Sequence, residues 1–220
     1  MSKLRLLFIK EAQASYISHL DLLRTFQRAF PRTELDIKHS QGYHPHPIIS
    51  IVLPLPVGQS SDCELLDFET VEETDGAGIA EKLNTGLPAG LRVRECYPVT
   101  RPVREFTFLR ARLELLYDNG VPAGTADALR ALFARETLMI EKRTKHKELA
   151  QIDIAPLIRE MTLTEQDGSI LADAVVAAQN PGLNPAYLAQ AIERELPSLK
   201  PDFVRVRRTE IYDTEGNVFR

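Results

Sequence analysis

Residues 40–47 concentrate chemically active side chains between two apolar segments: Ser40-Gln41-Gly42-Tyr43-His44-Pro45-His46-Pro47. Each proline fixes φ at about −65° and lacks a backbone donor, so the segment can be neither a regular helix nor a central strand. Gly42 permits a turn with positive φ. The sequence therefore predicts a stiff loop that presents its polar and aromatic side chains for binding or catalysis, namely Gln41, Tyr43, His44 and His46.

Three kinds of chemistry are open to this loop. Tyr43 offers an aromatic face on which a ligand can stack, with the histidines as hydrogen-bonding groups. Because residues two apart in extended backbone point to the same side, His44 and His46 could share a metal ion, with His19 as a third ligand. Either imidazole could also act as a general base near neutral pH. Binding is the favoured interpretation, and no cofactor is expected.

A helix is expected to begin after Ser18, which is an N-cap residue with Asp21 three positions later. Its predicted apolar face carries Leu20, Leu23, Phe26 and Phe30, with His19 projecting toward that face. Asp21, Arg24 and Arg28 form a separate polar stripe. That stripe is expected to face an anion; the alternative is solvent exposure with Asp21 as a capping residue.

The densest basic segment of the chain is residues 142–147, which contain Lys142, Arg143, Lys145 and Lys147. Such a segment can hold the phosphates of an RNA backbone. The alternative is a solvated loop. Net charge also changes along the chain: residues 1–60 carry +3, residues 61–90 carry −7, residues 91–147 carry +5 and residues 148–220 carry −5. This pattern is compatible with separate basic and acidic faces.

The elements that must position these residues follow one order twice. Strands are expected at 3–10, 35–38, 48–53, 63–71 and 91–99, with helices after Ser18 and at 78–83. The second half predicts strands at 106–117, 137–142, 161–164, 170–178 and 203–212, helices at 123–133 and after Asn184, and a helical turn at 154–158. We therefore expect an α+β protein of two tandem ferredoxin-like (βαββαβ) units with mostly antiparallel sheets, at residues 1–100 and 101–220.

Composition and missing motifs exclude several classes of protein. No uninterrupted apolar segment is long enough to cross a membrane, so no membrane association is expected. Cys63 and Cys96 form no CxxC pair, which fits a reducing, cytoplasmic setting. The chain lacks the CxxxCxxC triad of an iron–sulfur cluster, a Walker A loop and a GxGxxG fingerprint. It therefore cannot itself be a radical-SAM catalyst of the usual kind.

Several segments of the first half resemble a radical-SAM-linked family of bacterial proteins, a domain of unknown function found alone or fused after a cobalamin-binding radical-SAM protein. The match is carried by residues 16–24, Arg28-Ala29, residues 40–47 and residues 54–58, followed by Ser60 and Glu64. Residues 142–147 and 152–154 resemble the family's second half more loosely. Tyr43 stands where the family often has Phe, and His39 where Tyr is frequent.

The resemblance implies a radical-SAM protein as partner and an RNA-related substrate. The leading hypothesis is a cytoplasmic RNA-binding accessory protein that works with a radical-SAM enzyme in tRNA or rRNA modification. The alternatives are a stand-alone enzyme that depends on a metal or on His44 and His46, such as an RNA nuclease, and a protein adaptor that binds no nucleic acid.

Overall fold

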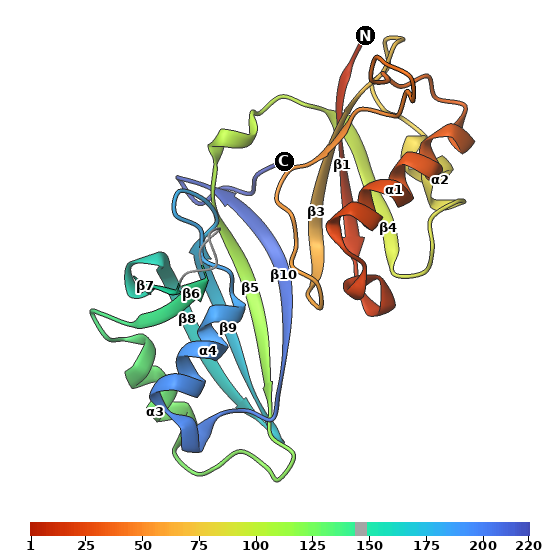
Figure 1. Ribbon diagram of the computed structural model, residues 1–220. Helices are drawn as coiled ribbons and strands as arrows, with labels where there is room; N and C mark the ends of the chain where they lie inside the picture. The colour runs from red at the N-terminus through yellow and green to blue at the C-terminus, as the bar shows by residue number, and fades with distance from the viewer. Residues whose placement is uncertain (144–148) are drawn as a thin grey trace. The chain divides into compact units, whose positions relative to one another are not determined.

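The chain divides into two compact units in the computed structural model, which describes residues 1–143 and 149–220 (Figure 1). The first unit is Met1–Glu105 together with Arg220, and the second is Phe106–Phe219. The 3-10 turn η3 (Val103–Glu105) closes the first unit.

The first unit contains a sheet with the strand order β4-β1-β3, and a short strand, β2, pairs with β3. Every neighbouring pair is antiparallel. Its elements, in chain order, are β1 (Lys3–Lys10), η1 (Ala12–Tyr16), α1 (His19–Ala29), η2 (Phe30–Thr33), β2 (Ile49–Ile51), β3 (Ser60–Glu69), α2 (Ile79–Asn84), β4 (Leu91–Pro98) and η3. The strand expected at 35–38 is reduced to one bridge, Ile37 with Thr70, and a second bridge, His39 with Pro47, follows it.

The side chains of β1 contribute to two different faces of this sheet, one apolar and one with charged residues. Leu4, Leu6 and Phe8 are fully buried and belong to the same core cluster as the buried residues of α1 and α2. The Phe8 ring meets the Phe26 ring of α1 edge-on, with centroids 4.9 Å apart. Since side chains alternate along a strand, Lys3 and Arg5 point to the opposite, helix-free face. The expected grouping of Leu4, Leu6 and Phe8 on one side is therefore confirmed.

Helix α1 is rotated relative to its predicted orientation. Its buried residues are Leu22, Phe26 and Ala29, whereas Leu20 is 61% exposed. Leu20 lies about 200° around the helix from Leu22, so both cannot face the sheet. The stripe of Leu22, Phe26 and Ala29 packs on the sheet. The expectation that Leu20 and His19 lie on the apolar face is wrong, since both are exposed.

The second unit has a four-stranded antiparallel sheet of order β10-β5-β9-β8 and a separate two-stranded sheet, β6-β7. Its elements are β5 (Phe106–Leu116), α3 (Thr125–Phe133), β6 (Met139–Arg143), β7 (Leu149–Asp153), η4 (Ala155–Leu157), β8 (Ile158–Gln166), β9 (Ser169–Ala177), α4 (Ala186–Glu195), η5 (Pro197–Leu199) and β10 (Phe203–Asp213). The expected α+β class with mostly antiparallel sheets is confirmed. None of the helices that the structure describes is both long and apolar enough to span a lipid bilayer.

Candidate functional site

The loop of residues 40–47 is closed by hydrogen bonds across its base. The backbone N–H of Ile48 donates to the Lys38 carbonyl at 2.9 Å, and that of Ser40 donates to the His46 carbonyl at 2.9 Å. The Ser40 hydroxyl accepts from the His46 backbone N–H at 3.2 Å and lies 2.9 Å from the imidazole Nδ1 of His46. Gly42 has φ +132°, which a residue with a side chain rarely adopts. The loop thus has a fixed base.

The closed base leaves the tip of the loop open to solvent. Gln41, Tyr43 and His44 are exposed, and the Tyr43 side chain is fully exposed at 101%. His46 is exposed too, but its Nδ1 is engaged by Ser40. The loop therefore presents an unshielded aromatic ring between an amide and an imidazole, which is an arrangement suited to stacking and hydrogen bonding.

On α1, two residues of the polar stripe, Asp21 and Arg24, bind each other. The Ser18 hydroxyl accepts from the Asp21 backbone N–H at 3.1 Å, and Arg24 donates to the Asp21 carboxylate at 3.1 Å. The Ser18 hydroxyl also donates to the Asp21 carboxylate at 2.7 Å, and this hydrogen bond, followed by that from Arg24, lowers the pKa of Asp21. Ser18 is therefore the N-cap of α1 and Asp21 is held by Ser18 and Arg24, while Arg28 is exposed one turn beyond Arg24.

These sequence-predicted residues do not assemble into one centre. Among the hydrogen bonds and ion pairs of residues 1–143 and 149–220, none joins α1 to the loop tip. In the same described part of the chain, no three His, Cys, Asp or Glu side chains are grouped to hold a metal ion, so His19, His44 and His46 do not form a ligand set.

The basic segment starts in the second unit. Lys142 lies in β6, with its ammonium 5.9 Å from the centroid of the Tyr187 ring, a cation–π distance. Arg143 ends β6. Lys145 and Lys147 lie outside the described residues.

A cavity of about 490 Å³, which sequence reasoning missed, lies on the helix-free face of the first unit. Its floor is formed by three paired strands, because Lys3 is opposite Glu69, Arg5 is opposite Asp67, and Asp67 is in turn opposite Ser50 of β2. Residues 99–103, which follow β4, form a wall. The alternation of charged and apolar residues in β1 and at the end of β3 was the sequence signal for such a charged face.

Two ion pairs organise the floor of the cavity. The fully buried Arg5 guanidinium donates to both carboxylate oxygens of Asp67, at 2.6 and 2.9 Å. Glu69 accepts from Lys38 at 2.7 Å and lies 3.7 Å from Lys3. The hydrogen bond from Lys38 is the main reason that the pKa of Glu69 is lowered. Both carboxylates are therefore held in place by cationic partners.

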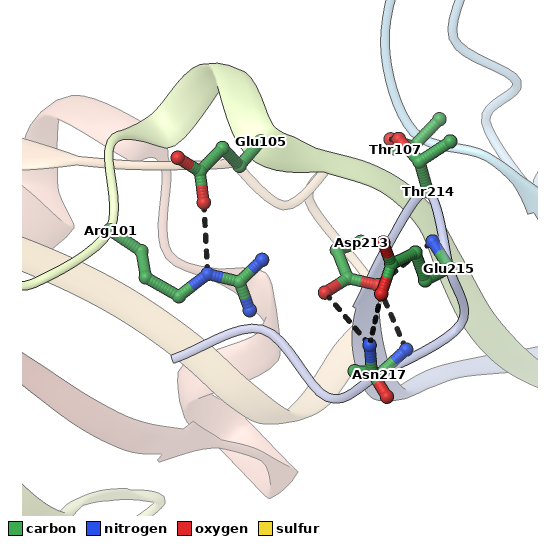
Figure 2. Close-up of polar contacts among 7 residues, drawn as sticks. All are labelled: Arg101, Glu105, Thr107, Asp213, Thr214, Glu215 and Asn217. Carbon is green, nitrogen blue, oxygen red and sulfur yellow. Dashed lines mark hydrogen bonds and ion pairs between the residues drawn. The ribbon is translucent and has the colours of Figure 1, made fainter.

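The loop and the cavity are structurally continuous. Lys38, at the base of the loop, binds Glu69 on the cavity floor, and Ile48, on the other side of that base, lines the cavity. In the wall, Arg101 donates to Glu105 at 2.9 Å (Figure 2). The exposed loop and this cavity together form the candidate site of the first unit.

Figure 2 also shows a turn of the second unit in which the acidic side chain has a local structural role. The Asp213 carboxylate accepts from the backbone N–H groups of Glu215 and Asn217, at 3.0 and 2.9 Å. The hydroxyls of Thr107 and Thr214 lie 2.8 Å apart and tie the turn to the start of β5. These contacts fix the end of β10.

Comparison with known proteins gives a family without an assigned reaction. The family model described as "Uncharacterized protein conserved in bacteria (DUF2344)" matches residues 3–185. No curated protein is significantly similar in sequence. A chain in the crystal structure of a Cbf5-Nop10-Gar1 complex is 12% identical with a TM-score of 0.49, over 94% of this chain and 48% of that chain. This chain thus spans about half the length of that one.

A second solved structure is an unknown protein from Galdieria sulphuraria. It is 12% identical with a TM-score of 0.28, over 94% of this chain and 98% of that chain. At these TM-scores neither structure bears on the chemistry of the site.

Proposed function

Because the chain belongs to this family of uncharacterized bacterial proteins, whose description names no reaction, we propose its function from the site: it binds RNA and acts as an accessory to a radical-SAM enzyme that modifies tRNA or rRNA. The observation that carries RNA binding is the fully exposed Tyr43 ring at the tip of a loop with a closed base. Unpaired RNA bases stack on such rings. Gln41 and His44 flank the ring as hydrogen-bonding groups, while Arg24, Arg28 and the basic segment are the proposed phosphate contacts.

The loop assignment is tested by replacing Tyr43. We expect Tyr43→Ala to weaken binding of a single-stranded RNA about tenfold or more, since one stacked base contributes about 1–3 kcal/mol. Tyr43→Phe should retain affinity because it keeps the ring. Fluorescence anisotropy with labelled RNA measures the change. Tyr16→Ala is the matched control, because Tyr16 is 68% exposed on η1. Equal affinities of the wild type and Tyr43→Ala would contradict the proposal.

The radical-SAM partner is proposed from the family resemblance, and three exposed apolar side chains support a protein partner. Tyr16, Leu20 and Val57 are 68%, 61% and 58% exposed. The Gly58 backbone N–H donates to the Ser15 carbonyl at 2.9 Å, which places Val57 next to Tyr16. These three residues also lie in the segments that carry the resemblance. We place this complex in the cytoplasm, where the thiols of Cys63 and Cys96 would stay reduced.

The role of these exposed apolar side chains is tested with Leu20→Asp. We expect this variant to lose most co-purification with a cobalamin-binding radical-SAM protein, because a charge at the centre of an apolar contact is desolvated on binding. Leu149→Asp is the control, since Leu149 is 66% exposed on the other unit. RNA affinity should be unchanged in both variants. Co-purification of Leu20→Asp at the wild-type level would count against this surface.

We further propose that the two units are tandem ferredoxin-like folds. Strand order supports this: β4-β1-β3-β2 in the first unit corresponds to β10-β5-β9-β8 in the second. In each unit the first and third of the four strands precede a helix. The β6-β7 hairpin is then an insertion after α3.

A further inference from the structure

The cavity of the first unit combines an apolar wall with a polar floor. Its volume of about 490 Å³ lies within the usual range for sites that enclose a small ligand. Val99, Pro102 and Ile48 supply apolar surface, and Ile48 is 43% exposed. A flat ring system can pack against such a wall while its edge faces the strands.

The floor offers hydrogen-bond acceptors at fixed positions. The Asp67 side chain is 25% exposed although Arg5 binds both of its oxygens. Each carboxylate oxygen has two lone pairs, so acceptor capacity remains on the cavity side. Ser50, which carries a hydroxyl, is paired with Asp67 in the β2–β3 register. Asp67 would accept from an amino group on the edge of a ligand, as carboxylates do with the exocyclic amine of cytosine.

Positively charged side chains lie near these acceptors. Lys3 is two residues from Arg5, or about 7 Å along the strand. Its side chain is 73% exposed and lies 3.7 Å from Glu69, which already accepts a 2.7 Å bond from Lys38. Lys3 can therefore turn toward an incoming anion. Arg101, 31% exposed, is a second cation of the wall.

We propose that this cavity binds one unstacked nucleotide whose base carries an exocyclic amino group. The amino group donates a hydrogen bond to Asp67, and the phosphate contacts the ammonium group of Lys3. This inference rests on the proposed RNA binding and names the subsite next to the Tyr43 loop. A purely anionic ligand would meet Asp67 and Glu69, and a purely cationic one would meet Lys3 and Arg101. A nucleotide places an amine and a phosphate at the two ends of one ligand and so matches both.

Calorimetry with free nucleotides tests the cavity separately from RNA binding. We expect CMP and AMP to bind and UMP to bind roughly fivefold more weakly or worse, because UMP presents a carbonyl to Asp67. Cytidine should bind more weakly than CMP because it lacks the phosphate. No binding of CMP or AMP at millimolar concentration, or equal binding of CMP and UMP, would overturn the proposal.

Two variants locate the binding. Lys3→Gln should lower CMP affinity about fivefold and leave cytidine affinity unchanged, because it removes only the phosphate contact. Lys200→Gln is the matched control, since Lys200 is an exposed lysine 3.4 Å from Glu193. Ser50→Tyr should fill the cavity and abolish binding of both ligands; Ser50 is exposed, so the fold should tolerate it. Equal effects of Lys3→Gln and Lys200→Gln would argue against the cavity.

The two proposals can fail independently. If RNA binds and depends on Tyr43 but no nucleotide enters the cavity, the nucleotide subsite is wrong and the proposed function stands. If CMP binds and responds to Ser50→Tyr but no RNA binds, the proposed function is wrong and the cavity is a site for free nucleotides.

Discussion

Tyr97 is a half-buried residue whose hydroxyl the fold buries without a hydrogen bond. Its hydroxyl has no partner among the described residues, although the side chain lies across from Arg5 in the β1–β4 register. Burial raises the pKa of Tyr97 to about 12, and the charge of Arg5 opposes that rise. The Arg5 guanidinium is directed to Asp67 on the other neighbouring strand. The hydroxyl thus loses its hydration without gaining a hydrogen bond within the described residues.

Tyr97→Phe should therefore be as stable as the wild type, or more stable by up to about 1 kcal/mol, because an unsatisfied buried hydroxyl is costly. Tyr117→Phe is the contrasting variant. The Tyr117 hydroxyl donates to the Leu199 carbonyl at 3.0 Å, so its removal should cost about 1 kcal/mol. Urea unfolding of both variants at neutral pH gives the comparison. An equal loss in the two would show that the Tyr97 hydroxyl is satisfied.

The same variant should change the stability at alkaline pH. The Tyr97 phenol ionises near its ordinary pKa of 10.0 in the unfolded chain and at about 12 in the folded one. Between these values the folded state holds more protons, so stability falls as pH rises through this window. Tyr97→Phe should show a shallower fall, measured by urea unfolding from pH 9 to about 12.

At the scale of elements, the order and type of most helices and strands could be predicted from the sequence because the signals are local, although β7 was not expected. Gly168 closes the β8–β9 hairpin, and the Gly and Pro residues around Tyr43 define the loop, since each restricts its own backbone. The predicted orientation of α1 was wrong because both Leu20 and Leu22 are apolar. Only packing against the sheet decides which of them is buried.

The cavity could not be predicted because it depends on pairing between distant residues. Lys3 and Glu69 are adjacent only after β1 pairs with β3, and Ser50 reaches Asp67 only through β2. The strand with which residues 137–142 pair could not be predicted for the same reason. That segment forms a strand as expected, but it pairs with β7 in a separate hairpin. A sequence pattern that indicates a strand does not indicate which other strand pairs with it.

For the whole molecule, the alternation of charge along the chain corresponds to ion pairs inside each unit. In the first unit, Arg5 with Asp67 and Lys38 with Glu69 join the basic segment 1–60 to the acidic segment 61–90. In the second, Arg110 with Asp173 and Arg135 with Glu195 join the two later segments. Charges paired in this way are less available to an RNA backbone, which leaves the segment around Lys142 as the main proposed phosphate contact.

Salt dependence of RNA binding tests that assignment at the level of the whole chain. Each phosphate neutralised on single-stranded RNA contributes about 0.7 to the slope of log affinity against log salt. Replacing Lys142, Arg143, Lys145 and Lys147 together by Ala should therefore make the slope shallower by up to about 3. The matched control replaces four basic residues elsewhere in the chain by Ala, namely the exposed Arg92, Arg94, Arg194 and Lys200.

Both variants change the net charge equally, so a general electrostatic effect would flatten the two slopes alike, whereas a specific contact would flatten only the first. Anisotropy titrations from about 50 to 200 mM salt resolve the difference. Because Tyr43 acts by stacking, Tyr43→Ala should lower affinity at every salt concentration and leave the slope unchanged. Flattening of the slope by Tyr43→Ala would mean that the loop acts through charge and not through its ring.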